Sequence, residues 1–330
     1  MIALPGRARH RLRHRVATRR RARPDGRHTG DTGPPVESAF RTDSQGCALS
    51  DRLAVLPQYL LPKLALTRLM GTLAGCHGGR LTAGAIRRFV ARYGVNMAEA
   101  ADPDIASYPT FNAFFTRALK PGARPLADAA WLCPVDGAIS QFGALDGDRL
   151  LQAKGHTYTA RALVGGDAAL AGRFSGGGFA TLYLSPRDYH RIHMPCRGEL
   201  RRMIHVPGDL FSVNPTTARG VPGLFARNER VVCEFDTDHG AFVLVLVGAT
   251  IVGSMATVWH GVVNPPRPGG LREWTYQPGA VVLARGAEMG RFLLGSTVVM
   301  LFPAGKIGFN PAWAPGGAIR MGETMGSLPS

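Results

Sequence analysis

The sequence predicts an α+β fold with a largely antiparallel β core and short N-terminal amphipathic helices packed at one side. Two observations support this fold class. Leucines recur at helical spacing between Leu53 and Met70. After Trp131 the chain changes to short apolar runs that are broken by glycine, proline, aspartate and asparagine. The spacing of these runs favours an antiparallel core over a parallel βαβ sheet.

The composition is that of a globular chain with a strongly basic surface. Its 330 residues are 45% hydrophobic and 19% charged, which is enough to bury a substantial core. The formal net charge is +16, and the excess of Lys and Arg extends beyond the first 50 residues. A basic body favours anionic partners, either nucleic acid or an acidic lipid surface. Aromatic side chains are few and are not interleaved with the basic ones, which argues against nucleic acid.

Three regions follow from the changes in composition. Residues 1–48 are rich in Arg, Gly, Pro and Ser, and we expect a disordered basic extension or a start placed upstream of the true one. We expect residues 49–125 to form a helical region that associates with a membrane. We expect residues 126–330 to form a β-rich catalytic domain.

Some site classes are not supported by the sequence. The five cysteines are scattered without a C-x-x-C pair, so we expect no disulfide framework and no metal. No run of about 18 apolar residues could span a bilayer. No G-x-G-x-x-G follows a strand and no P-loop occurs, so nucleotide cofactors are not expected.

The helical region should contain helices over Leu53–Met70, interrupted by Pro57 and Pro62, over Ala85–Tyr93, and over Asn112–Leu119. Two interpretations of their apolar faces remain open. The helices could cap the core. Alternatively, they could lie in a lipid headgroup layer, with leucines in the acyl chains and cations at the phosphates. The cations are Lys63, Arg68, Arg87, Arg88 and Arg92.

Strands are expected in the second half of the chain, where the apolar runs lie. The predicted ranges are 135–143, 149–153, 179–184, 199–205, 230–235, 241–247, 281–284 and 298–302.

The stretch Gly286–Thr297 lies between the last two predicted strands and ends in Gly295-Ser296-Thr297. One interpretation is a tight turn, in which Ser296 and Thr297 form local hydrogen bonds. The other is a reactive peptide bond, in which the Ser296 hydroxyl attacks the Gly295 carbonyl.

Three further motifs carry polar groups suited to chemistry. Asp136 precedes a glycine in Pro134–Gly137, where an Asx turn is the simplest interpretation. His190 and His193 lie three residues apart in Tyr189–Pro195, where core histidines or half of a metal site are the alternatives. Residues 206–215 are expected to form a loop in which apolar and polar groups are mixed.

Taken together, these residues supply what a nucleophilic serine requires. Ser296 offers the hydroxyl, His193 a base, and Asp136 a carboxylate that fixes the tautomer of the base. An ordinary Ser-His-Asp hydrolase is one alternative, although the G-x-S-x-G elbow is absent. A non-catalytic β domain that binds anionic lipid or nucleic acid is another.

The chain resembles phosphatidylserine decarboxylase, the pyruvoyl-dependent membrane enzyme, in its bacterial form. The resemblance runs from about Leu53 to Gly326 and depends on many short motifs in register. They are Leu60–Leu64, Thr110–Thr116, Pro134–Gly137, Gln152–Gly155, Tyr189–Pro195, Phe211–Pro215, Val247–Ser254, Gly286–Phe292 and Leu294–Thr297.

The resemblance implies a proenzyme that cuts itself at Gly295-Ser296. His193, oriented by Asp136, would deprotonate Ser296, and the product would be a β chain of residues 1–295 and an α chain of residues 296–330. Ser296 would become a covalent pyruvoyl group, which forms a Schiff base with the substrate amine and accepts the electrons released by decarboxylation.

The resemblance also implies a substrate and a location. The expected reaction converts phosphatidylserine to phosphatidylethanolamine and CO₂, with His190 as first candidate for proton donor and His193 as second. Phe211, Ser212 and Val213 would line the headgroup pocket. The expected protein is a heterodimer of its own α and β chains, with a homodimer of these left open, peripheral to the cytoplasmic face of the cell membrane and without a nucleic-acid partner.

Overall fold

The computed structural model describes residues 47–250, 254–264, 269–293 and 296–329, all within the unit of residues 35–330. Side chains are described in these ranges except at residues 47–49 and 52. The predicted basic extension therefore lies almost wholly outside the described residues, and so does Gly295.

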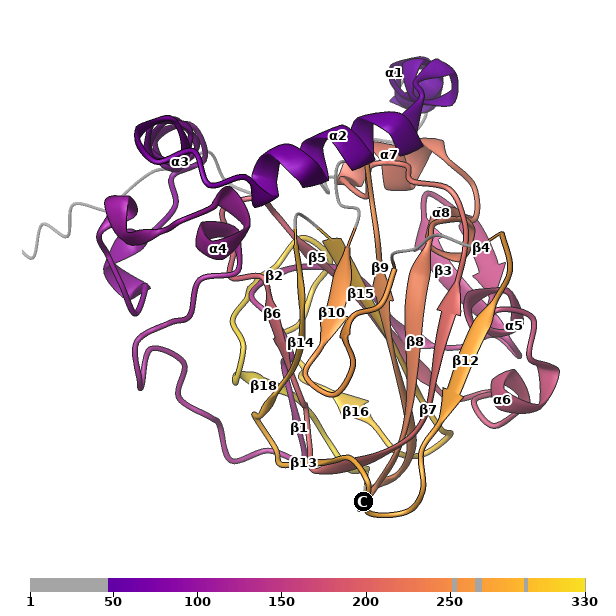
Figure 1. Cartoon of the computed structure of the whole chain (residues 1–330). Coiled ribbons are helices and arrows are strands. Elements are labelled where there is room, and N and C mark those ends of the chain that lie inside the picture. The colour runs from indigo at the N-terminus through magenta and orange to yellow at the C-terminus, as the bar shows by residue number, and fades with distance from the viewer. Residues whose placement is uncertain (1–46, 251–253, 265–268, 294–295, 330) are drawn as a thin grey trace, which may run out of the picture. The chain divides into compact units, whose positions relative to one another are not determined.

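Three helices precede the sheets and lie across one end of the strands (Figure 1). They are α1 (Cys47–Leu60), α2 (Lys63–Gly75) and α3 (Arg80–Tyr93). The predicted interruption at Pro57 is wrong, because Pro57 lies inside α1. A proline there removes only one intrahelical hydrogen bond. Pro62 does break the helix, as the residue before α2.

The fourth helix is shorter than predicted. α4 (Phe111–Phe115) begins at Thr110, whose hydroxyl accepts a hydrogen bond from the Ala113 amide at 3.0 Å. It ends at Phe115 instead of Leu119, because the chain turns there to pair Leu119 with Ala100 in an isolated β bridge. This early end leaves the residues after α4 in an extended segment beside the sheets.

The largest sheet is antiparallel throughout and runs in the order β12-β7-β8-β9-β15-β5-β2-β17, with β13 also beside β7. Its strands are β2 (Gly137–Ala144), β5 (Gly178–Leu184), β7 (Gly198–Val206), β8 (Arg230–Thr237), β9 (Gly240–Val247), β12 (Arg272–Thr275), β13 (Val282–Leu283), β15 (Ser296–Phe302) and β17 (Ala318–Ile319).

Smaller antiparallel sheets complete the β structure. One runs β11-β10-β14-β6, another β1-β18-β16, and β3 pairs with β4. The strands are β1 (Trp131–Leu132), β3 (Arg149–Ala153), β4 (His156–Thr159), β6 (Arg191–His193), β10 (Met255–Thr257), β11 (Gly261–Val262), β14 (Glu288–Phe292), β16 (Gly308–Phe309) and β18 (Thr324–Ser327).

The core lies on both faces of the large sheet. Along β9, Val243 and Val245 join one apolar cluster, whereas Leu244 and Leu246 join the other. Side chains alternate between the faces of a strand, so a strand buried on both faces is apolar at every position. Four short helices contribute to the first cluster: α5 (Ala160–Leu163), α6 (Ala168–Gly172), α7 (Pro215–Gly220) and α8 (Leu224–Arg227). The α+β prediction is confirmed.

Candidate active site

Ser296 is the first residue of the central strand β15. It lies opposite Leu184 of β5, and Thr297 pairs with both Tyr183 and Val247. Both residues are fully buried, and neither hydroxyl has a hydrogen-bond partner among the described residues. The interpretation of a tight turn at Gly295 stays a prediction, because residues 294–295 lie outside the described residues.

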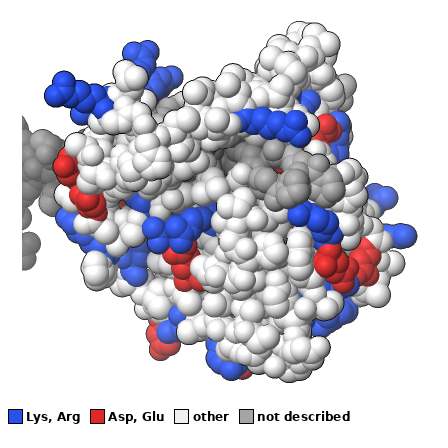
Figure 2. All heavy atoms as spheres, viewed as in Figure 1, with Lys and Arg blue, Asp and Glu red and all other residues white. Residues whose placement is uncertain are grey.

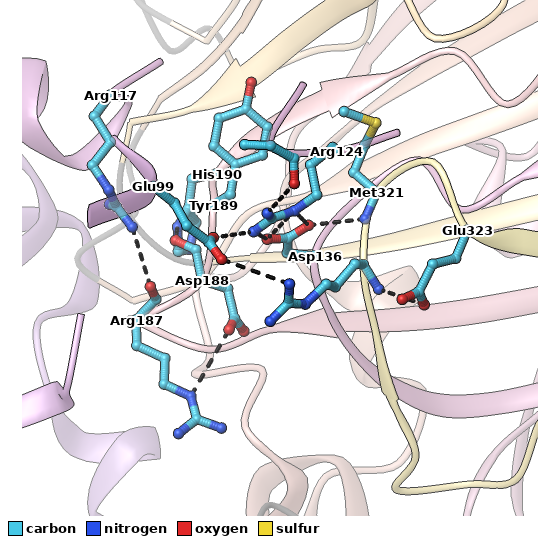
Figure 3. A network of polar contacts seen from close by, with 12 residues as sticks. Glu99, Arg117, Arg124, Asp136, Arg187, Asp188, Tyr189, His190, Met321 and Glu323 are labelled. Carbon is cyan, nitrogen blue, oxygen red and sulfur yellow. Dashed lines mark hydrogen bonds and ion pairs between the residues drawn. The ribbon is translucent and has the colours of Figure 1, made fainter. Parts of the chain in front are cut away.

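Asp136 is buried just before β2 and is held by two groups (Figure 3). Arg124 donates from Nε to both carboxylate oxygens, at 2.9 and 3.1 Å, and the Met321 amide donates to Oδ1 at 2.8 Å. Arg124 also pairs with Glu99 at 2.7 Å. The hydrogen bond to Asp136 raises the pKa of the Arg124 guanidinium above its ordinary value. The carboxylate thus contacts groups distant in sequence and does not form an Asx turn.

The glycine after Asp136 permits a close approach of two strands. A Cβ at Gly137 would lie 2.2 Å from the Tyr183 carbonyl oxygen, so only glycine fits there. Ala138 pairs with Tyr183, which in turn pairs with Thr297. Asp136 and Ser296 therefore lie at the same end of three adjacent strands, about 10 Å apart along the sheet by strand spacing.

His193 is the last residue of β6, opposite Glu288 of β14. Its Nδ1 donates to the Gly286 carbonyl at 2.8 Å, because a carbonyl can only accept. Its Nε2 therefore accepts from the Tyr189 hydroxyl at 3.0 Å. Burial lowers the pKa of His193, so the ring is neutral near pH 7.

His190 is fully buried and lies against the ring of Phe115, at 4.0 Å between centroids. Its Nδ1 donates to the Asp188 carbonyl at 2.8 Å, and its Nε2 has no partner among the described residues. Burial lowers the pKa of His190 to about 3. The ring is therefore neutral, with a free lone pair on Nε2.

A pocket of about 320 Å³ lies beside this network, and it includes His193, Tyr189, Arg124 and Glu288. Within the described part of the chain, no hydrogen bond joins any two of Asp136, His193 and Ser296. The acceptor at His193 Nδ1 is the Gly286 carbonyl, so the role of Asp136 in orienting the base stays a prediction.

The predicted headgroup loop packs under the first two helices. The Phe211 ring lies 4.0 Å from Nζ of Lys63 and 4.9 Å from the Tyr59 ring. The Ser212 amide donates to the Gln58 side chain at 2.9 Å, and Val213 is buried. A role for Phe211, Ser212 and Val213 in binding the headgroup stays a prediction.

Sequence reasoning missed several groups of this network. Tyr189 and the Gly286 carbonyl lie inside motifs that the sequence analysis singled out, so their positions were marked without their roles. Arg124 has no local signal, because it contacts Asp136 through a loop that follows no period. Glu288, which pairs with Arg191 at 2.9 Å, becomes visible only when β14 is placed beside β6.

Two further properties concern the described residues only. They contain no group of three or more His, Cys, Asp and Glu side chains arranged to hold a metal ion. None of their helices combines the length and apolar character needed to cross a bilayer.

Comparison with known proteins identifies the family. The family model described as phosphatidylserine decarboxylase matches residues 111–327, and a second, described as PSD, matches residues 53–94. The phosphatidylserine decarboxylase proenzyme of Azoarcus sp. (strain BH72) is 71% identical over 280 residues, covering 85% of this chain and 97% of that protein. The proenzyme of Dechloromonas aromatica (strain RCB) is 71% identical over 279 residues, covering 84% and 99%. This chain belongs to the phosphatidylserine decarboxylase family.

Proposed function

We propose that this chain is a proenzyme that cuts itself between Gly295 and Ser296 and then decarboxylates phosphatidylserine to phosphatidylethanolamine and CO₂. The observation that carries the proposal is the Ser296 hydroxyl, which is fully buried without a described partner at the start of a central strand. An unsatisfied buried hydroxyl costs about 1–3 kcal/mol. Such a cost is expected where the hydroxyl is kept for chemistry.

In the processing step, Ser296 Oγ attacks the Gly295 carbonyl carbon while His193 takes the hydroxyl proton. The amide nitrogen leaves, and the peptide bond becomes an ester. Loss of the Ser296 α proton then breaks its Cβ–Oγ bond, which releases a β chain ending in the Gly295 carboxylate. The dehydroalanine left at position 296 tautomerises, and water displaces ammonia to leave a pyruvoyl group on the α chain. Asp136 would stabilise the protonated His193.

The described residues fit a pyruvoyl group at position 296. The position is enclosed between β5 and β9 and is fully buried. The pyruvoyl carbonyl supplies an electron sink for decarboxylation. His190 Nε2 has no partner among the described residues and is suited to take a proton from the substrate ammonium and return it to the carbon that loses CO₂. An anionic substrate nearby would raise the pKa of His190 toward the range that this role requires.

The helical face supports binding to an anionic membrane surface. Leu60 and Leu81 are 89% and 83% exposed, and five more leucines of α1 and α2 are exposed. In Figure 2 the surface over α1 and α2 is mostly uncharged, with Lys and Arg around it. Asp51, the one acidic residue of α1–α3, is buried against Lys154 and Arg219. This face suits the anionic cytoplasmic leaflet, where the protein would be peripheral.

Intact mass under denaturing conditions tests the proposal. We expect two chains that meet between residues 295 and 296, the smaller without a free N-terminal amine and with the mass of a pyruvoyl cap. Ser296→Ala and His193→Ala should remain full-length and inactive. His190→Ala should cleave but decarboxylate poorly. One unbroken wild-type chain that still decarboxylates phosphatidylserine would contradict the proposal.

A further inference from the structure

Arg117, which follows α4, carries a buried positive charge that the site described above does not use. The residue is 4% exposed. Its Nη2 donates to the Arg187 carbonyl at 3.2 Å (Figure 3). Its Cζ lies 5.3 Å from the Phe114 ring centroid. Nε and Nη1 are buried without an acceptor among the described residues. Most of the donor capacity of this guanidinium is therefore unused.

The carboxylates whose charges act on Arg117 are paired with other arginines. Asp136 and Glu99 pair with Arg124, and Asp188 lies 3.9 Å from Arg187. Arg117 itself forms no ion pair with a described carboxylate. Burial lowers the pKa of Arg117, as expected for a desolvated cation. Burying an unpaired charge is unfavourable, and a bound anion would remove the penalty.

Arg117 directly precedes residues that line the candidate site. The three residues after it, 118–120, line the pocket that contains His193 and Tyr189. Its charge also acts on His190, whose Nε2 is buried without a hydrogen-bond partner among the described residues. An anion held by Arg117 would thus lie near His190, next to the chain segment that lines this pocket.

The substrate carries two anionic groups, and the chemistry selects between them. The carboxylate loses its charge as CO₂ departs, so a cation bound to it would stabilise the ground state more than the transition state. The phosphodiester keeps its charge throughout the reaction. We propose that Arg117 binds the phosphodiester of the phosphatidylserine headgroup, an inference that rests on the proposed function.

Binding to uncleaved protein tests this without the pyruvoyl group. In a full-length Ser296→Ala background, NMR titration would follow four probes: glycerophosphoserine, glycerophosphoethanolamine, O-methylserine and inorganic phosphate. Arg117→Gln should weaken binding of both glycerophospho probes by about tenfold or more and leave O-methylserine unchanged. Arg117→Lys, which keeps the charge, should lose less. Arg187→Gln removes a neighbouring, more exposed charge and should have no effect.

Steady-state kinetics of the cleaved enzyme gives a second readout. Arg117→Gln should process fully by intact mass and should raise KM for phosphatidylserine in mixed micelles, with little change in kcat. Wild-type activity shows independently whether the proposed function holds.

Several results would overturn the inference. One is that Arg117→Gln loses affinity only for the probes that carry serine, and another is that Arg187→Gln loses as much affinity as Arg117→Gln. A third is that the Ser296→Ala parent shows no binding that depends on the phosphate group. A fourth is that inorganic phosphate binds as tightly as the glycerophospho probes. The last would indicate a general anion site.

Discussion

At the scale of single residues, Tyr189 controls the base proposed for processing. Its hydroxyl donates to His193 Nε2 at 3.0 Å. In the proposed processing step, the lone pair of this nitrogen receives the Ser296 proton. The hydroxyl must therefore turn away before His193 can act. Tyr189→Phe removes one neutral hydrogen bond of about 1 kcal/mol, so we expect processing to become about fivefold faster.

Pulse-chase labelling, with the two chains separated by mass, measures this rate. Tyr183→Phe is the matched control, because Tyr183 lies on β5 and does not contact His193 through its hydroxyl. Slower processing in Tyr189→Phe would mean that the hydroxyl relays the proton instead of restraining the base.

His190 should make stability depend on pH. Its pKa is about 3 in the folded chain and about 6.5 when unfolded, so between these values the unfolded chain binds the extra proton. The contribution of His190 to the free energy of unfolding is therefore fully present above pH 6.5 and is lost as the pH falls. Between pH 7 and pH 5 the loss is about 2 kcal/mol.

Urea unfolding of the Ser296→Ala chain at pH 7 and pH 5 measures this difference. His190→Gln should reduce the pH dependence by about that amount, whatever its effect on stability at pH 7. Burial also lowers the pKa of His193, which therefore adds to the pH dependence in the same direction. Its contribution is the same with and without His190→Gln, so it cancels in the comparison. An unchanged pH dependence in His190→Gln would show that His190 titrates normally.

At the scale of elements, an ion cluster around the buried Asp51 carboxylate attaches α1 to the β domain. The Asp51 carboxylate accepts from Lys154 Nζ at 2.7 Å and from Arg219 Nε at 3.0 Å. Lys154 adopts the left-handed conformation, with φ of 47°, which is uncommon outside glycine. Burial acts to raise the pKa of Asp51, but hydrogen bonds from Arg219 and Lys154 outweigh it and lower the pKa.

Asp51→Asn should loosen α1, because the variant weakens hydrogen bonds between charged groups, each worth about 1.5–3 kcal/mol. Hydrogen exchange of the amides in residues 47–60 should become faster in this variant, while the strands of the large sheet keep their protection. Asp128→Asn, at an exposed position, serves as the control. Equal exchange in α1 of both variants would show that packing alone holds the helix.

The sequence predicted long elements better than short ones. The apolar runs that became β5, β7, β8 and β9 were located to within two residues, because strands of seven to nine residues show their pattern clearly. Helices α5 to α8 have four to six residues, too few for a helical period.

The motif Gln152–Gly155 shows no role in the sequence alone. Gln152 binds three backbone groups around α7 and α8, and Lys154 holds Asp51.

At the scale of the whole molecule, motif order indicated the candidate residues but not their contacts. Asp136, His193 and Ser296 come from three strand ends, and which partner each side chain takes depends on loops that follow no period. The partner of Asp136 is Arg124, and that of His193 is Tyr189. Only the packed structure shows these pairs.

The helices help to cap the core, and their binding to a membrane stays a prediction. Val55, Ala74 and Ile86 face inward and are buried, whereas Leu60 and Leu81 are exposed. Because exposed leucines contribute little to folding, Leu60→Glu with Leu81→Glu should leave thermal stability nearly unchanged. Each lost leucine removes about 1.5–3 kcal/mol of burial in acyl chains, so vesicle affinity should fall by more than tenfold.

Co-sedimentation with vesicles of phosphatidylserine and phosphatidylcholine measures this affinity. Leu328→Glu is the matched control, since Leu328 is 45% exposed and lies beyond the helical region. Added salt should weaken binding further, because Arg68, Arg87 and Arg88 are exposed on the same helices and anionic headgroups attract them. Unchanged sedimentation of the double variant would mean that the exposed leucines do not enter the bilayer and that the helices serve the core alone.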